Sequence, residues 1–193
     1  MSKRNFFQTP QGMHDLLPED QKYFQKIYHL ADTLANFYSF GKIDTPILEY
    51  AELFEKGTGS STEIIEKQMF HLRTRGGDSL ALRPEFTPGI MRAFLQHGMT
   101  NLPQPVKLYS IGPIFRHESP QAGRLRQFHQ VNFEIFGERS STIDAQTIQI
   151  FYNLLAELKF KNPIIEVNSI GASCCRPYFK KVLTTYLKSR FNS

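Results

Sequence analysis

Two arginines, a carboxylate and an aromatic ring lie close together in the sequence, within residues 114–134. Arg116 and Glu118 are two positions apart, and Arg124 precedes Phe128 by four positions. An arginine fork pairs with phosphate oxygens through two hydrogen bonds and stays charged at any working pH. A ring can stack on a purine, and a carboxylate can accept a hydrogen bond from an exocyclic amine. These residue types in this order indicate a site that holds a nucleoside triphosphate without a glycine-rich phosphate loop.

Two strands joined by a short loop must position these groups. The first arginine and the carboxylate are predicted to lie on one strand, where alternate residues share a face. Residues 126–136 alternate in character, which predicts a returning strand whose one face carries Phe128, Gln130 and Glu134. Each residue taken singly is better explained by an Arg–Glu pair across two strands or by a core phenylalanine. Taken together, several polar groups beside a ring favour a binding surface.

The rest of the pattern predicts helices before and after a central group of strands. The order favours an antiparallel-rich α+β fold, with helices flanking the sheet, over a wound parallel sheet. The chain has neither a Gly-x-Gly-x-x-Gly sequence nor a P-loop, which disfavours two common nucleotide-binding folds. The predicted elements are a helix from Pro18 that ends at Gly41, an extended segment at 43–50, a loop at 53–61, a hairpin of 68–73 and 79–83, a helix capped by Thr87 with Pro88 at its first position, strands at 106–111, 126–136 and 164–167, and helices at 142–158 and 173–190.

Composition excludes several classes of protein. The 193 residues suffice for one domain, and 40% hydrophobic with 21% charged residues is typical of a soluble globular chain. The sequence has no apolar stretch near the ~20 residues that span a bilayer, and no apolar leader follows the basic pair Lys3–Arg4. The net charge of +5 permits a polyanionic partner but does not establish one.

The sequence predicts no metal site. Cys174 and Cys175 are the only cysteines, and adjacent cysteines lack the spacing of a zinc pair, so they are predicted to be reduced thiols in a reducing cytosol. The histidines are scattered along the chain without ligand spacing on any predicted element. The late basic residues are predicted to form a solvated helix face; they are Lys180, Lys181, Lys188 and Arg190.

The same segments resemble the signature motifs of the class II aminoacyl-tRNA synthetases. Residues 115–118 with 124–128 are similar to motif 2, and residues 41–48, with Pro46, resemble motif 1. Within the class the chain resembles histidyl-tRNA synthetase, and the resemblance runs in order over nearly its whole length. The segments that carry it are Gln11–Asp15, Leu53–Phe54, Arg75–Gly77, Leu82–Thr87, Arg124–Gly137 and Val167–Gly171.

This resemblance implies a role for each nucleotide-site candidate. Arg116 would be the catalytic residue, because it would grip the α-phosphate of ATP and stabilise the charge that develops when the histidine carboxylate attacks. Arg124 would hold the outer phosphates, Glu118 would accept from the adenine amine, and Phe128 would stack on the adenine.

The resemblance also implies a histidine-binding set. Its members are Glu85, Phe86, Thr87, Arg116, Gln130 and Glu134. Glu85, Thr87 and Gln130 would hold the α-ammonium group, and Glu134 would contact the imidazole. Arg116 would border the bound histidine as well as the α-phosphate. Phe86 stands where bacterial members usually have glycine, so its ring would either narrow the amino-acid pocket or mark a subfamily. Equally economical interpretations are a dipole-favoured acid for Glu85 and a helix cap for Thr87.

The implied activity is histidine–tRNA ligation. Histidine and ATP, with Mg²⁺, would form histidyl-adenylate, and the histidyl group would pass to tRNA(His) in a cytoplasmic homodimer built through motif 1. The family's second histidine motif, its motif 3 and its anticodon-binding domain do not appear before Ser193. Residues 1–193 are therefore expected to be a partial catalytic domain that is weak or inactive alone.

Two other functions remain open. The regulatory subunit of ATP phosphoribosyltransferase shares this fold and senses histidine, but it typically loses the ATP-contacting residues that this chain retains. A degenerate synthetase-like domain that binds RNA for regulation would show RNA binding without any dependence on histidine.

Overall fold

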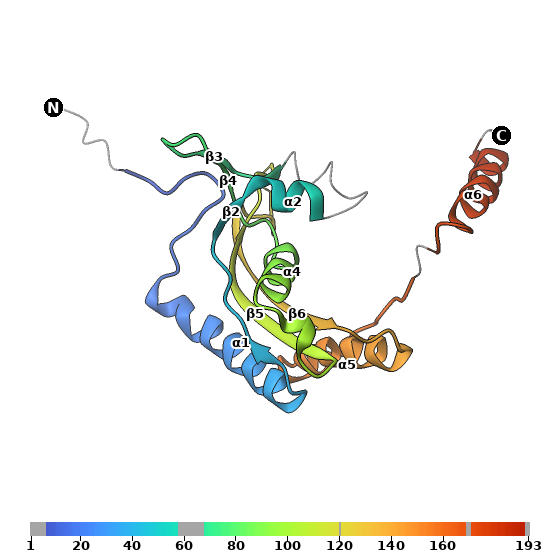
Figure 1. Cartoon of the computed structure of the whole chain (residues 1–193), viewed down its shortest axis with the longest axis horizontal. Helices are drawn as coiled ribbons and strands as arrows, with labels where there is room; N and C mark the ends of the chain where they lie inside the picture. The colour runs from blue at the N-terminus through green and yellow to red at the C-terminus, as the bar shows by residue number, and fades with distance from the viewer. Residues whose placement is uncertain (1–6, 58–67, 120, 169–170, 192–193) are drawn as a thin grey trace. The chain divides into compact units, whose positions relative to one another are not determined.

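The computed structural model describes residues 7–57, 68–119, 121–168 and 171–191, which form two compact units (Figure 1). The first unit, Met1–Phe160, contains every strand assigned in these residues, and the second, Lys161–Ser193, contains helix α6 (Arg176–Phe191). No helix in the described ranges is long and apolar enough to cross a membrane. Each unit is described by itself.

A three-stranded sheet is the centre of the first unit. Its order is β1 (Gly41–Lys42), β5 (Val106–Phe115) and β6 (Gln127–Phe136); β1 runs parallel to β5, and β6 runs antiparallel to it. The register pairs Ile114 with Phe128 and Leu108 with Glu134. The even-numbered residues of both long strands therefore share one face, and the odd-numbered residues share the other.

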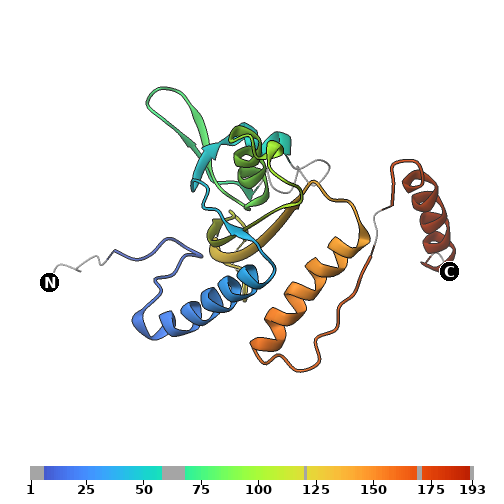
Figure 2. The same cartoon turned by 60° about the horizontal axis from the view of Figure 1, so that its bottom comes forward.

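Helices cover both faces of this sheet (Figures 1 and 2). Helix α4 (Thr87–Gln96) packs on the even face through a core of six buried residues and partly buried neighbours: Phe86, Ile90, Phe94, Val106, Leu108, Ile114, Ile43, Met99, Phe128 and Phe136. Helices α1 (Pro18–Phe37) and α5 (Ser141–Glu157) cover the odd face, where Ala35 and Ile150 pack against Tyr109 and Phe133. The two helical layers leave the polar residues of β6 on the α4 side.

A second, smaller sheet contains the strand that precedes α4 in the chain. Its order is β2 (Leu48–Tyr50), β4 (Ser79–Leu82) and β3 (His71–Arg73), all antiparallel. Helix α2 (Ala51–Gly57) follows β2, and Ala51 and Phe54 pack on Ala81 and Met69.

Arg83 joins the two sheets. Its side chain is 6% exposed and donates to the carbonyl oxygen of Pro113 on β5 at 3.0 Å and to that of Thr45 at 2.8 Å. Its guanidinium carbon also lies 4.4 Å from the centroid of the Phe86 ring. The Arg83 backbone adds a hydrogen bond in each direction, to Ile47 and from Phe115. One residue thus connects the end of β4 to the C-terminal end of β5, the central strand of the large sheet.

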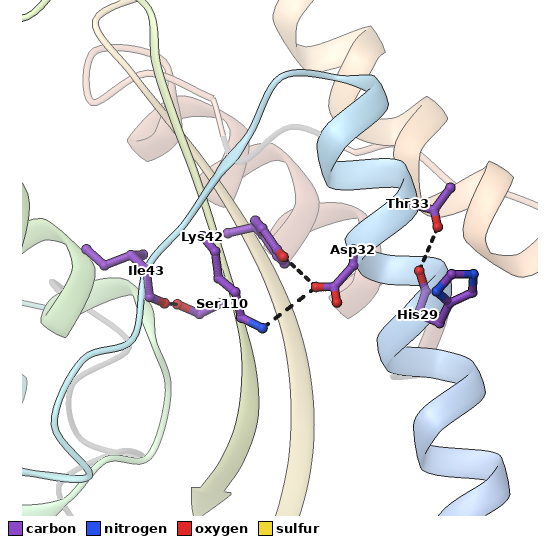
Figure 3. Close-up of polar contacts among 7 residues, drawn as sticks. His29, Asp32, Thr33, Lys42, Ile43 and Ser110 are labelled. Carbon is purple, nitrogen blue, oxygen red and sulfur yellow. Dashed lines mark hydrogen bonds and ion pairs between the residues drawn. The ribbon is translucent and has the colours of Figure 1, made fainter.

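Helix α1 is tied to the large sheet by a separate polar cluster (Figure 3). The Tyr109 hydroxyl donates to the Asp32 carboxylate, and Lys42 lies 3.8 Å from the same oxygen. Burial, then the hydrogen bond and charge of Asp32, raise the pKa of Tyr109, so the hydroxyl stays a donor over any working pH. On the other face, the Ser110 hydroxyl donates to the carbonyl oxygen of Ile43.

The structure confirms the α+β class and most predicted elements, but two predictions, one about a helix end and one about a loop, were wrong. Helix α1 ends at Phe37, and the left-handed residue after it is Ser39 (φ 62°) instead of Gly41, which belongs to β1. The Phe40 amide donates to the Ala35 carbonyl, so burial of Phe40 fixes the turn in place of a glycine. The loop predicted at 53–61 is helical up to Gly57, and its positions 58–61 lie outside the described residues.

Two strand predictions were also wrong. The segment 164–167 forms no strand, because these residues have no neighbouring strand to pair with in the described ranges. Arg116 and Glu118 do not share a strand, since β5 ends at Phe115 and both residues follow it. The Arg116 amide still donates to the Arg126 carbonyl at 3.0 Å, so the chain keeps its direction for one further residue.

Replacing Arg83 with methionine tests the connection between the sheets. We expect Arg83→Met to lower the free energy of unfolding by about 3 kcal/mol, because two carbonyl oxygens lose a charged donor in a buried setting. Urea denaturation followed by circular dichroism measures this difference. Arg73→Met, at an exposed position of β3, is the matched control and should change stability by less than about 0.5 kcal/mol. Equal effects of the two substitutions would contradict the role given to Arg83.

Candidate active site

A cavity of about 340 Å³ opens where β5 ends and β6 begins. Its lining contains all four residues predicted from the sequence to bind a nucleotide. The lining residues are Arg116, Glu118, Gly123, Arg124, Leu125 and Phe128. The two arginines and the ring therefore border one space, as a nucleotide site would require.

Arg116 is the most firmly held cation of this cavity. Its Nε donates to the Pro84 carbonyl oxygen at 2.9 Å, and its guanidinium carbon lies 5.5 Å from the centroid of the Phe128 ring. Both terminal nitrogens lack a protein acceptor among the hydrogen bonds of the described residues. A guanidinium fixed through Nε and a ring face keeps its two outer nitrogens available for a bidentate anion.

Arg124 is held more loosely, on the loop between the strands. Its side chain is 62% exposed, and it pairs with the 17% exposed Glu118 carboxylate at 3.2 Å. An ion pair this open to solvent contributes at most about 1 kcal/mol. A phosphate group could therefore compete for Arg124 at small cost and leave the carboxylate to another donor.

Arg126 anchors the same loop from behind, a role that the sequence analysis missed. Its Nε donates to the Glu118 carbonyl oxygen at 3.1 Å, and its amide donates to the Gly12 carbonyl oxygen at 2.7 Å. Gly12 has a φ of +78°, and a Cβ there would meet Arg126 Cγ at 2.9 Å. Only glycine fits this position, so the Gln11–Gly12 segment is the sequence signal that could have located the anchor.

A second polar group lies beside the first, where α4 begins over β6. Thr87 donates to Oε1 of Glu134 at 2.5 Å, and Asn132 Nδ2 donates to the same oxygen at 2.9 Å. Thr87 therefore does not cap the helix: it is the first residue of α4, and the preceding residue occupies the cap position without a side-chain hydrogen bond. Asn132 is a further member that sequence reasoning did not select, although it lies on the predicted face.

Glu85 connects the two groups electrostatically. Burial raises the pKa of the Glu85 carboxyl, the charge of Arg116 opposes this shift, and the charge of Glu134 adds to it. Two carboxylates and one arginine thus act on the same region. A positively charged ligand placed among them would favour the ionised form of Glu85.

Gln130 and Phe86 occupy less open positions on the same side of the sheet. The Gln130 Oε1 atom is buried and accepts no hydrogen bond among the described residues, which is costly unless a ligand or water supplies a donor. The Phe86 ring is 2% exposed and belongs to the core beneath α4. A Cβ on Gly112, the partner of Gln130 on β5, would lie 3.2 Å from Arg83 and 3.8 Å from this ring.

Comparisons with known proteins show which sequences this chain resembles. Residues 12–172 match the sequence model of the histidyl-tRNA synthetase family. The chain is 44% identical over 180 residues to a histidine–tRNA ligase of Aquifex aeolicus, covering 93% of this chain and 45% of that protein. A histidine–tRNA ligase of Dehalococcoides mccartyi is also 44% identical, over 183 residues and 43% of its length.

Solved structures give the same result. The apo histidyl-tRNA synthetase of S. aureus superimposes with a TM-score of 0.76 at 30% identity, covering 95% of this chain and 43% of that one. A protein of Bacillus halodurans C, described as an ATP phosphoribosyltransferase regulatory subunit/histidyl-tRNA synthetase, has a TM-score of 0.70 at 27% identity, with 84% and 40% covered. This chain thus spans less than half the length of the relatives it matches. The sequence match over most of the chain, on a fold of the same kind, shows that it belongs to the histidyl-tRNA synthetase family.

Proposed function

We propose that this chain forms the ATP- and histidine-binding part of a histidine–tRNA ligase catalytic domain. The observation that carries the proposal is that Arg116, Glu118, Arg124 and Phe128 border one cavity. Beside it, Glu85, Thr87, Gln130 and Glu134 project from the start of α4 and from the same face of β6. A triphosphate site and an ammonium-binding site thus share a wall, which is the arrangement that joining an amino acid to a nucleotide requires.

The chemistry would take place at Arg116. An oxygen of the histidine carboxylate would form a bond to the α-phosphorus of ATP while the bond to the pyrophosphate oxygen breaks. Negative charge then builds on the α-phosphate oxygens, and the outer nitrogens of Arg116 would stabilise it. Because Pro84 and the Phe128 ring already orient this guanidinium, little reorganisation is needed at the moment of reaction.

Selection of histidine would depend on Glu134. Thr87 and Asn132 both donate to Oε1 of this carboxylate, which orients the group and leaves Oε2 to accept from an imidazole N–H. An acceptor that a bound ligand would cover rejects amino acids that lack the matching donor, because the acceptor would then remain unpaired. Glu85 would then attract the α-ammonium group.

The remaining partners follow from this reaction. Mg²⁺ would accompany ATP chiefly through phosphate oxygens and water, because Glu118 is the only carboxylate that lines the described cavity and it pairs with Arg124. The whole protein would transfer histidine to tRNA(His) in the cytoplasm. A homodimer would form through the motif 1 region at residues 41–48.

A histidine-sensing regulatory subunit is the second candidate, and the Bacillus halodurans neighbour gives it support. The two candidates differ in the nucleotide. A sensor would bind histidine without needing Arg116, Arg124 and Phe128 around one cavity, whereas a ligase needs all three. Their presence together favours the ligase.

Isothermal titration of ATP tests the nucleotide site. We expect Arg116→Gln to weaken ATP binding by roughly 10- to 100-fold, the value of a charge-assisted hydrogen bond to phosphate. Phe128→Leu should weaken it by roughly 10-fold through lost stacking. Arg73→Gln on the distant β3 is the matched control and should bind as the parent does. ATP affinity that is unchanged by Arg116→Gln in a folded variant would exclude the proposed site, and histidine binding without ATP binding would favour the sensor.

Pyrophosphate exchange tests the extent of the catalytic domain. We expect the 193-residue chain to catalyse little or no histidine-dependent exchange between ATP and labelled pyrophosphate. The matched part is less than half the length of its relatives, so most of each relative lies outside the match. A full-length family member serves as the positive control. Clear exchange by the isolated chain would overturn the expectation of weak activity.

Glu85→Gln should separate stability from binding. The raised pKa means that the folded state holds the Glu85 proton more tightly than the unfolded state does. The carboxyl therefore contributes most to stability below its unfolded pKa, and this contribution is lost as pH rises through the folded pKa. We expect Glu85→Gln to be more stable than the parent at pH 8, with the difference shrinking or reversing towards pH 4, and to bind histidine more weakly.

Urea denaturation at the two pH values measures the difference in the free energy of unfolding between variant and parent. Taking this difference cancels the contribution of the groups that titrate alike in both proteins. Glu166→Gln, at an exposed position of the second unit, is the control. A Glu85→Gln variant that is less stable than the parent at pH 8 would contradict the direction given.

A further inference from the structure

The second unit contains a pair of thiols that the proposed function does not use. Cys174 and Cys175 are both exposed and both free, and their sulfur atoms lie 4.0 Å apart. The Cys175 thiol donates to the Ala172 carbonyl oxygen at 3.5 Å, and that carbonyl also accepts from the amides of Cys175 and Arg176. A turn immediately before α6 therefore holds two sulfurs side by side and open to solvent.

These two sulfurs are poorly placed to form a disulfide with each other. A disulfide needs about 2.05 Å between its sulfurs and usually 4.4–6.8 Å between its Cα atoms. Neighbouring residues have Cα atoms about 3.8 Å apart across a trans peptide, which is below that range. Closing the bond would also require the sulfurs to approach from 4.0 Å. The pair is thus better suited to a bridging atom that keeps the sulfurs apart.

Zinc satisfies the distance but not the coordination number. Two thiolates on a tetrahedral zinc at about 2.3 Å each lie roughly 3.8 Å apart, close to the separation here. A stable zinc site also takes three or four protein ligands. The described residues contain no group of three or more histidine, cysteine, aspartate or glutamate side chains that could hold a metal. The ligand that fits must be thiophilic and need two sulfurs only.

We propose that Cys174 and Cys175 form a dithiol site that captures a monosubstituted trivalent arsenical. Such a compound, R–As=O, needs two thiolate sulfurs to complete its three-coordinate arsenic. In the reaction two As–S bonds form and both As–O bonding pairs are lost from arsenic. The oxygen leaves with the two thiol protons as water, and arsenic remains trivalent. Neither an oxidant nor a reductant is needed.

The space around the turn allows this ring to form. Gly171 precedes the pair with a φ of +72°, and a Cβ placed on it would lie 3.8 Å from the Cys175 sulfur. That distance is an ordinary van der Waals contact, so the turn does not crowd the Cys175 sulfur on the Gly171 side. A bridged pair would carry its substituent into solvent, since both cysteines are exposed.

Intact-protein mass spectrometry with phenylarsine oxide tests the site. The reduced and desalted 193-residue chain is treated with one equivalent of the compound and then with increasing glutathione, a monothiol. We expect one phenylarsenic group per chain, with the loss of two hydrogens. The adduct should resist roughly 100-fold more glutathione than that of a single-cysteine variant, the gain typical of a second attachment on a short linker. The dithiol dimercaptopropanol should remove it.

Cys174→Ser and Cys175→Ser are the matched variants, and both positions are exposed, so circular dichroism should show unchanged helix content. The proposal is overturned if either variant keeps the adduct as strongly as the parent, because one thiol would then suffice. It is equally overturned if glutathione strips the parent at the concentration that strips the variants, or if no adduct forms.

Discussion

The buried guanidinium of Arg83 is the contact on which the geometry of the site depends. It joins the end of β4 to the carbonyl of Pro113 in β5 and to that of Thr45 in the segment after β1. The next residues of the chain are Pro84, whose carbonyl orients Arg116, and Glu85, which faces the same arginine. A shift of the small sheet relative to the large one would therefore move Arg116 and Glu85 together. Because a buried charged donor is costly to leave unpaired, this connection opposes such a shift.

The site itself combines rigid and loose parts. Phe128 lies near the start of β6 and Arg116 directly follows the end of β5, whereas Arg124 lies on a turn, where its exposed guanidinium pairs with Glu118. This division suits a reaction in which the α-phosphate must be placed accurately and the outer phosphates must leave as pyrophosphate. Burial and the negative charge of Glu134 raise the pKa of the Glu85 carboxyl, and a bound cationic group would oppose that shift.

The long strands and the polar face of β6 were predictable from the sequence. Side-chain character alternates over residues 126–136, and alternate residues of a strand share one face. The four candidate nucleotide-site residues were selected by their types and spacing, and the family resemblance then suggested a role for each. Contacts between segments distant in the chain were not predictable. Threonine is a common helix cap, so the sequence predicted that role for Thr87. Its hydroxyl donates to Glu134 instead, because β6 lies beneath α4. Arg126 reads as an ordinary strand residue until Gly12 is placed behind it. The turn after α1 shows the same limit, since Ser39 adopts a left-handed conformation that Gly41 seemed to offer.

The support that Gly12 gives to Arg126 has a consequence for the order in which the protein matures. Gln11 and Arg126 meet across a separation of 115 residues, and β1 pairs with a strand that begins more than 60 positions later. At roughly 5–20 residues per second, a ribosome needs several seconds or more to supply the partner of the first segment. Until the second long strand begins to emerge, the carbonyl oxygens of Gln11 and Gly12 lack their donors on Arg126. The cavity bordered by Arg116 and Phe128 therefore cannot be complete until the second long strand has been synthesised, although Gly12, which supports its loop, is among the first residues made.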